Sequence, residues 1–296
     1  MPVIDQKDVL KGLSVAEAMR RQVIAVSADS PIEKAIRFTI KYKVNAILVT
    51  DPDRHALGVV TKTDLMGACY AELPLETPVE TIMVGPPLFC RQEDSLDAAL
   101  DSMRTQRIHR LYVYDNDPRQ AVGVLAYPDI VGLLYRFCRP CDKSILKKKA
   151  GQLEGDLAGH LTVREVMTEG VASFPAEASL LEVMAGLAAT RLAAVLIRGV
   201  DGGPEGVVSK TDLISAYKHN LPHETPAREV MSTPVRACLQ DDYLALAIQE
   251  MIFWDIHRLF VTKRENQEIV GVLSLSDAAR FRSGTCRACL VSRISV

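Results

Sequence analysis

Four apolar runs of this sequence are each followed by an aspartate. In three of the four, a threonine or serine stands three residues before the aspartate. The residues are Thr61 and Asp64, Ser209 and Asp212, Ser274 and Asp277, and, in an incomplete fourth copy, Asp129. Where a strand turns into a helix, free N–H groups, a hydroxyl and the helix dipole suit a phosphate. A carboxylate can accept hydrogen bonds from both hydroxyls of a ribose. The same spacing also forms capping boxes, and we expect both roles.

A His-Arg pair occurs twice, as His109-Arg110 and His257-Arg258, each directly before an apolar run. Arginine offers a planar fork to a phosphate, and histidine adds a donor that titrates near neutral pH. A pair of polar residues that is solvated or paired with carboxylates would explain each copy alone. The recurrence at an offset of 148 residues favours phosphate binding.

Lys62 and Lys210 recur at the same offset and are further candidates for phosphate contacts. An exposed lysine at the start of a helix would, however, need no function. The second copy departs from the pattern, because Ala126 has no hydroxyl and Pro128 precedes Asp129. This copy is therefore the weakest candidate for phosphate binding.

Two C-x-x-C pairs also stand 148 residues apart, as Cys138 with Cys141 and Cys286 with Cys289. Four thiolates can complete a tetrahedral zinc site, and the same spacing suits an iron–sulfur cluster or a redox dithiol. We favour zinc over iron–sulfur, and the alternative is an idle remnant of a duplication. The other cysteines are expected in the core, at Cys69, Cys90 and Cys238.

These candidates lie in a fourfold repeat, marked by glycines at 58, 123, 206 and 271 and by methionines at 19, 83, 167 and 231. Each unit reads as a helical turn, then β, α, β, β and α. In the first unit, Ser30-Pro31-Ile32-Glu33 predicts a capping box. Strands are expected at 46–49 and 57–60, and a helix at 64–71. Ser179 and Glu182 predict another capping box.

One such unit cannot bury both faces of its sheet, so we expect two units to pack sheet to sheet. The predicted organisation is α+β, with four units in two pseudo-twofold modules. The expected bounds are 14–73 and 78–140, a linker at 141–161, then 162–220 and 225–283, and a cysteine-containing tail at 284–296.

The lead helix that ends on Met, the Gly-h-h-Thr/Ser-x-x-Asp segment and the β-α-β-β-α order together resemble the CBS domain family. The resemblance covers nearly the whole chain four times. It implies two tandem Bateman modules that stack into a disc and bind regulatory ligands, most often adenine nucleotides, between paired units. The His-Arg pair is similar to that in the gamma subunit of AMP-activated kinase, where it reaches phosphates.

Composition and the absence of known motifs argue against several classes of function. The 296 residues include 35 Lys and Arg against 37 Asp and Glu, which gives no basic footprint for nucleic acid. Neither a signal peptide nor an apolar membrane span is apparent, so we expect a cytoplasmic location. There is no P-loop, metalloprotease motif or nucleophile elbow. Since the repeats occupy the chain, we expect no enzyme activity.

The sequence thus predicts a regulator that binds AMP, ADP, ATP or a related adenosyl ligand and acts on an unidentified target protein. A homodimer through the module faces is plausible by family analogy. Two alternatives remain, namely a metal or redox sensor that uses the C-x-x-C pairs and an interaction scaffold with vestigial clefts.

Overall fold

A computed structural model describes residues 12–132, 162–190 and 192–281. The first unit contains β1 (Ala25–Ser27), α2 (Ile32–Lys41), β2 (Ala46–Thr50), β3 (Ala56–Thr61) and α3 (Lys62–Tyr70). Its sheet has the order β1-β2-β3, with β1 parallel and β3 antiparallel to the middle strand. The predicted β-α-β-β-α order is therefore confirmed in this unit.

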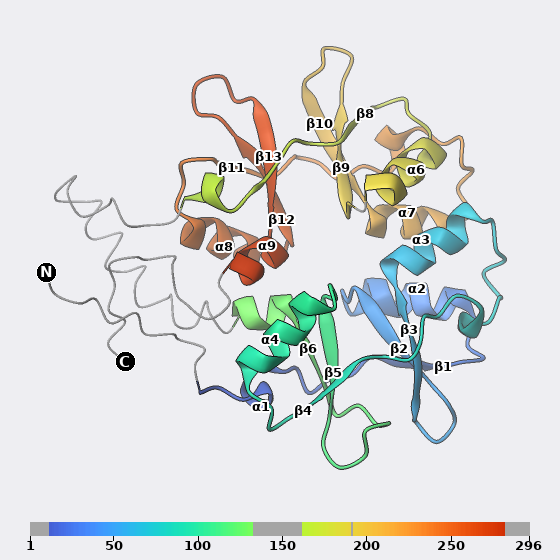
Figure 1. Cartoon of the computed structure of the whole chain (residues 1–296). Coiled ribbons are helices and arrows are strands. Elements are labelled where there is room, and N and C mark those ends of the chain that lie inside the picture. Colours follow the sequence, from blue (N-terminus) through green and yellow to red (C-terminus); the bar gives the residue numbers. More distant parts are fainter. Residues whose placement is uncertain (1–11, 133–161, 191, 282–296) are drawn as a thin grey trace, which may run out of the picture.

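The other three units repeat this arrangement around a ring (Figure 1). The second has β4 (Phe89–Arg91), α4 (Leu96–Thr105), β5 (Arg110–Tyr114) and β6 (Gly123–Ala126), followed by a helix that begins at 127. The third has β8 (Ser173–Pro175), α6 (Leu180–Thr190), β9 (Ala194–Arg198), β10 (Pro204–Ser209) and α7 (Lys210–Lys218). The fourth has β11 (Ala237–Leu239), α8 (Leu244–Phe253), β12 (Arg258–Thr262), β13 (Ile269–Ser274) and α9 (Leu275–Phe281).

One of the two predicted capping boxes is wrong. Helix α2 begins after Pro31, whose ring has no acceptor for the first N–H groups, and no side chain caps it. Ser30 is buried, and its hydroxyl instead accepts a hydrogen bond from Lys34 Nζ at 3.2 Å. The capping box at α6 is confirmed, because Ser179 N donates to Glu182 Oε2 at 2.8 Å and Glu182 N donates to Ser179 Oγ at 3.2 Å.

The short lead segments cross over to the other unit of their module. They are α1 (Val15–Ala18), η1 (Val79–Thr81), η3 (Val163–Glu165) and η4 (Ala227–Glu229). After α1, Arg20 pairs with Val124 on β6. After η3, β7 (Thr168–Glu169) joins the edge of the fourth unit's sheet next to β13. Each unit of a pair therefore completes its neighbour, which explains why they fold as modules.

This crossover explains why a glycine leads each repeated segment. A β-carbon at Gly271 would lie 2.6 Å from the carbonyl oxygen of Thr168 and 3.0 Å from Met167 Sδ. At Gly206 it would lie 2.6 Å from Met231 Sδ. The glycines and the lead methionines of the sequence repeat thus contact each other across the two units.

Gly271→Ala is expected to lower the free energy of unfolding by about 1–3 kcal/mol, because the clash is with backbone and no side chain can rotate to relieve it. Gly67→Ala is the matched control. It lies inside α3 with open space around its β-carbon, so we expect a gain of about 0.5–1 kcal/mol. Urea unfolding of both variants measures the difference, and equal effects would contradict the crossover contact.

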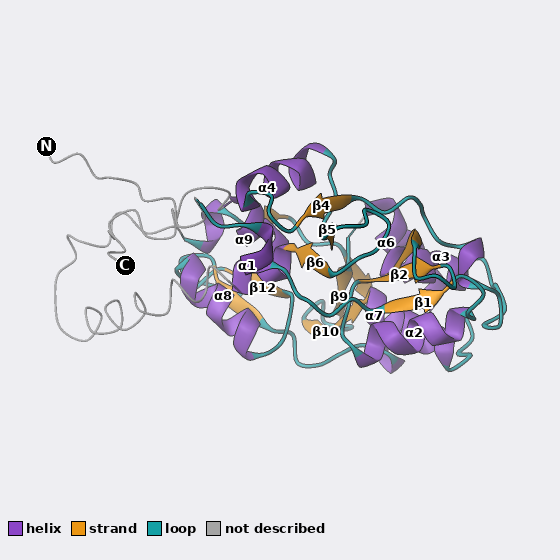
Figure 2. Cartoon of the chain, turned by 90° about the horizontal axis from the view of Figure 1, so that it is seen from below, coloured by secondary structure: helices purple, strands orange, loops and turns teal. Residues whose placement is uncertain are grey.

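Within the first module the two sheets face each other, as predicted. Leu48 on β2 packs with Tyr112 on β5 and Val124 on β6 in one buried cluster. Figure 2 shows the sheets and helices from below. Since the sheets occupy the inside of the module, its helices are left to cover the outer faces and to meet the second module.

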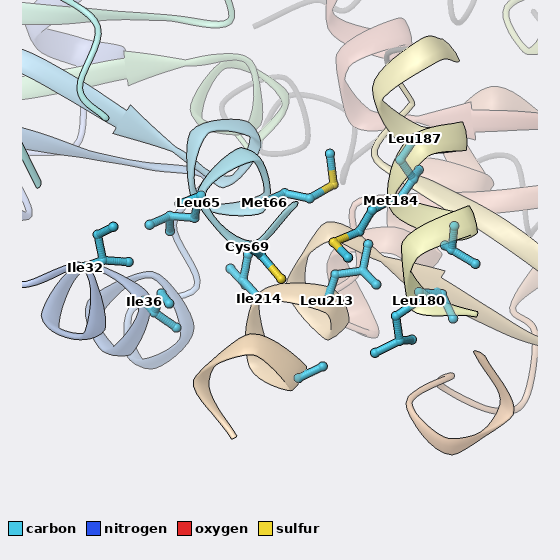
Figure 3. Close-up of a cluster of buried hydrophobic side chains, with 14 of the residues drawn as sticks. Ile32, Ile36, Leu65, Met66, Cys69, Leu180, Met184, Leu187, Leu213 and Ile214 are labelled. Atoms are coloured by element: carbon cyan, nitrogen blue, oxygen red, sulfur yellow. The ribbon is translucent and has the colours of Figure 1, made fainter. Parts of the chain in front are cut away.

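The two modules stack through their helices, with the first unit on the third and the second on the fourth. One core cluster joins α2 and α3 to α6 and α7, and another joins α1 and α4 to α8 and α9. Figure 3 shows Met66 on α3 and Met184 on α6 facing each other in this interface. Each fully buried side chain of the interface, such as Leu65 or Leu213, contributes about 1.5–3 kcal/mol.

The prediction that three cysteines belong to the core is confirmed, since all three are buried free thiols. Burial raises the pKa of Cys69 to about 11, and that of Cys90 and Cys238 to about 12. These thiols are therefore neutral at physiological pH.

Among the described residues, no helix is both long and apolar enough to cross a membrane.

Candidate functional site

The predicted hydroxyl and carboxylate pairs form the N-caps of α3, α7 and α9. Thr61 N and Oγ1 both donate to Asp64 Oδ2 at 2.7 Å, and Asp64 N donates back to Thr61 Oγ1 at 3.3 Å. Ser209 with Asp212 and Ser274 with Asp277 repeat this geometry. The capping role is confirmed, and it holds each carboxylate at the point where a strand enters a helix.

The four carboxylates differ in what their second oxygen contacts. Within the described chain, no hydrogen bond reaches Oδ1 of Asp64 or of Asp277. Ser232 Oγ lies 3.4 Å from Oδ1 of Asp212. In the second unit, Arg20 Nε binds Asp129 Oδ1 at 2.9 Å. Asp129 is thus the least available of the four to a ligand, and Arg20 is a residue that the sequence pattern did not identify.

Two lysines cross between the modules in a reciprocal pair of hydrogen bonds. Lys62 Nζ donates to Thr211 Oγ1 at 2.8 Å, and Lys210 Nζ donates to Thr63 Oγ1 at 2.8 Å. The lysines are not exposed, as the alternative had assumed, since Lys62 is half-buried and Lys210 is buried. Thr63 follows Lys62 and Thr211 follows Lys210, and the two Lys-Thr steps stand 148 residues apart. Each lysine therefore donates to the threonine that follows the other lysine.

Burial and neighbouring cations make both ammonium groups easier to deprotonate. Desolvation, with repulsion from Arg258 and Arg110, lowers the pKa of Lys62 to about 8, although Asp212 opposes the shift. Desolvation and Arg258 also lower the pKa of Lys210, against the attraction of Asp64. The capping carboxylate of the opposite module therefore attracts each ammonium group electrostatically.

Both predicted arginines stand at the start of a middle strand and are half-buried. Arg110 Nη1 donates to Ala46 O of the first unit at 3.3 Å. Desolvation is the main cause that lowers the pKa of Arg110 and of Arg258. Asp277 and Asp212 attract Arg258, so this side chain lies between the caps of α9 and α7.

The two histidines lie beside these arginines. Desolvation, Lys62 and Arg258 lower the pKa of His257, which favours its neutral imidazole. The ring of His109 meets Tyr127 edge to face at a centroid distance of 5.7 Å. Tyr127 stands at the repeat position that Lys62 and Lys210 occupy in the first and third units. The second unit therefore replaces a cation with an aromatic ring.

Residues from all four units thus meet at the interface between the modules. We call them the central cluster: Lys62, Arg110, Lys210, His257 and Arg258, with the capping carboxylates Asp64, Asp212 and Asp277 around them. Desolvated cations in such a place favour an anion with several charges, and phosphates match their geometry. The described geometry therefore suits the binding of such an anion.

The four cysteines of the C-x-x-C pairs, Cys138, Cys141, Cys286 and Cys289, lie outside the described residues. So do the predicted linker and tail.

The fold and the central cluster define a protein built of paired β-α-β-β-α units around a cationic interface. A sequence profile described as "CBS domain" matches residues 15–71, 79–136, 163–219 and 227–284. The chain belongs to the CBS domain family, and its four units form two Bateman modules.

Similar proteins agree with this architecture. The CBS domain-containing proteins CBSCBSPB5 and CBSCBSPB4 of Arabidopsis thaliana are each 26% identical in an alignment of 241 residues that covers 72% of this chain and 43% of theirs. Protein MJ1225 of Methanocaldococcus jannaschii, described as a proposed archaeal homologue of g-AMPK, has a TM-score of 0.73 at 16% identity and covers 91% of this chain and 99% of its own. An uncharacterized conserved protein from Pyrococcus horikoshii has a TM-score of 0.58 at 15% identity, with 91% and 100% covered.

The sequence alone identified every residue of the central cluster, but not all of the residues that contact the predicted site residues. It missed Arg20, Thr63 and Thr211, whose roles depend on contacts between units. The two threonines could have been found from their recurrence beside the lysines. Arg20 has Thr168 as its counterpart in the third unit and so carried no repeat signal.

Proposed function

We propose that this chain is a non-catalytic regulator that binds adenine nucleotides between its paired units, with the phosphates at the central cluster. The observation that carries the proposal is the meeting of two lysines and two arginines whose pKa values are all lowered by burial. Desolvated charges of one sign are unfavourable where their counter-charge is incomplete, and here three capping carboxylates accompany four cations. A di- or triphosphate supplies that charge, and its binding energy includes the relief of this repulsion.

The nucleoside part of the ligand follows from the carboxylates. Oδ2 of Asp64 and of Asp277 is used in capping, which leaves Oδ1 of each for a sugar hydroxyl. Asp212 is next, and Asp129 is last because Arg20 holds it. Thr61, Ser209 and Ser274 complete the binding corners as helix N-caps. The adenine itself is suggested by the family rather than by a contact.

AMP, ADP and ATP are expected to stabilise the protein, since a ligand at 100 times its dissociation constant adds about 2.7 kcal/mol to the free energy of unfolding. Thermal unfolding with each nucleotide, and with S-adenosylmethionine, tests this. A rise of roughly 5 °C or more is expected for the preferred ligand. The absence of any shift at millimolar nucleotide would contradict the proposal.

Asp64→Asn and Asp277→Asn are expected to reduce nucleotide affinity about tenfold or more, while the melting temperature of the free protein changes little. Asparagine keeps one carbonyl oxygen for the cap but loses the second acceptor for a ribose. Glu182→Gln is the matched control, because Glu182 caps α6 in the same way away from the central cluster. Equal losses in all three variants would show that the carboxylates act only through helix stability.

Regulation requires an output, so we propose that nucleotide binding changes how the stacked modules present themselves to a target protein. Association of two chains through module faces is a second possible output. Since the chain spans less than half of the Arabidopsis relatives' length, those proteins give no guide to the partner.

A further inference from the structure

A pocket opens between the modules at the opposite ends of the two helices that carry Lys62 and Lys210. It has a volume of about 480 Å³ and is lined by residues 72–76 and 220–224, together with Cys69 and Tyr217. Every lining residue of one module stands 148 positions from a lining residue of the other. The pocket therefore lies on the pseudo-twofold axis that relates the modules, and both modules would contact anything bound there.

The electrostatics of the pocket are the reverse of those at the central cluster. The lining carries the carboxylates Glu72, Glu76 and Glu224, and none of its residues is lysine or arginine. Helices α3 and α7 end at Tyr70 and Lys218, directly before the two lining segments. The carbonyl ends of both helix dipoles therefore point toward the pocket and add partial negative charge.

The walls between these charges are apolar and held in place. Leu73 and Pro74 line the pocket together with their equivalents Leu221 and Pro222 from the other module. The Tyr217 hydroxyl donates a hydrogen bond to Leu73 O of the other module. His223 lies 3.8 Å from the Cys69 thiol through Nε2 and 3.5 Å from Glu72 through Nδ1. These contacts join the two modules at the pocket without filling it.

We propose that this pocket binds a small organic cation with an aliphatic body, of the diamine or polyamine class. Ammonium groups would pair with Glu76 and Glu224 on either side of the axis, and the methylene chain would pack on the leucine and proline walls. A bare metal ion would leave those apolar walls without a partner. The proposal does not depend on nucleotide binding at the central cluster.

Spermidine and putrescine are the probes, titrated by calorimetry into the full chain at constant ionic strength. The expected result is saturable binding to the wild type and at least a tenfold loss of affinity in the double variant Glu76→Gln/Glu224→Gln. Both glutamates are exposed, so the variant is expected to fold normally, which circular dichroism checks.

The control variant Glu80→Gln/Glu229→Gln removes the same charge from exposed positions outside the pocket. It is expected to bind spermidine as the wild type does. Three results would overturn the proposal: no saturable binding, an equal loss in the control variant, or equal stabilisation by magnesium chloride at the same ionic strength. The last two would mean that any binding reflects diffuse surface charge.

Discussion

Replacing Lys62 by methionine is expected to raise the free energy of unfolding of the ligand-free protein and to weaken nucleotide binding at the same time. Methionine keeps much of the aliphatic length of the side chain but removes a charge that is half-buried near Arg258 and Arg110. Lys210→Met is expected to act in the same direction, because its ammonium group is also desolvated.

The direction of the pKa shift of Lys62 sets the sign of the expected change in the free energy of unfolding. The pKa of Lys62 is lowered from 10.5 to about 8 on folding. Between those values the unfolded chain binds more protons, so stability rises with pH through that window. Below about pH 8 the unfavourable contribution is present in full. We expect Lys62→Met to recover on the order of 1–3 kcal/mol at pH 7, since one pKa unit corresponds to about 1.4 kcal/mol.

Urea unfolding at pH 7, with and without ATP, measures both effects. Lys41→Met is the control, because Lys41 is exposed at the end of α2 and should change neither quantity. If Lys62→Met instead lowers stability, then Asp212 and Thr211 fully compensate the buried ammonium. The cations of the central cluster would then be compensated without a bound anion.

Much of the fold follows from the sequence because its signals are local or recur at a fixed spacing. The apolar runs and the Ser179 capping box depend on neighbouring residues. The glycines and lead methionines repeat along the chain, although they contact each other across units, and the structure confirms these signals. The failed capping box at Ser30 shows the limit of such signals. Pro31 directly precedes the first helical residue, and burial turned the serine hydroxyl toward Lys34 instead.

The residues of the candidate site could be predicted from the sequence, but the contacts between them could not. The recurrence of Lys62 and Lys210 singled them out, yet only the stacking of the modules makes each one reach the other's threonine. The pairing of Arg20 with Asp129 likewise requires the lead segment to cross to the other unit. Periodicity within a unit has no information on such crossings, because they depend on how whole sheets and helices pack.

Nucleotide affinity is expected to fall as the pH rises above about 8, by up to about tenfold per pH unit, with proton uptake on binding. The phosphates favour the charged form of Lys62, which loses its proton near this pH in the free protein. The lowered pKa of Lys210 acts in the same direction, whereas the phosphates and His257 change little in this window. The second phosphate ionisation is complete well below it, and His257 is already neutral because burial lowers its pKa.

Calorimetry with ATP between pH 7 and 9, in buffers of different ionisation enthalpy, measures the protons taken up. The double variant Lys62→Arg/Lys210→Arg is the decisive control, because guanidinium groups stay charged throughout this range. It is expected to bind with little dependence on pH and without proton uptake. If the wild type shows the same flat profile, then Lys62 is charged in the free protein at pH 9. The repulsion from Arg258 and Arg110 would then be too weak to drive phosphate binding.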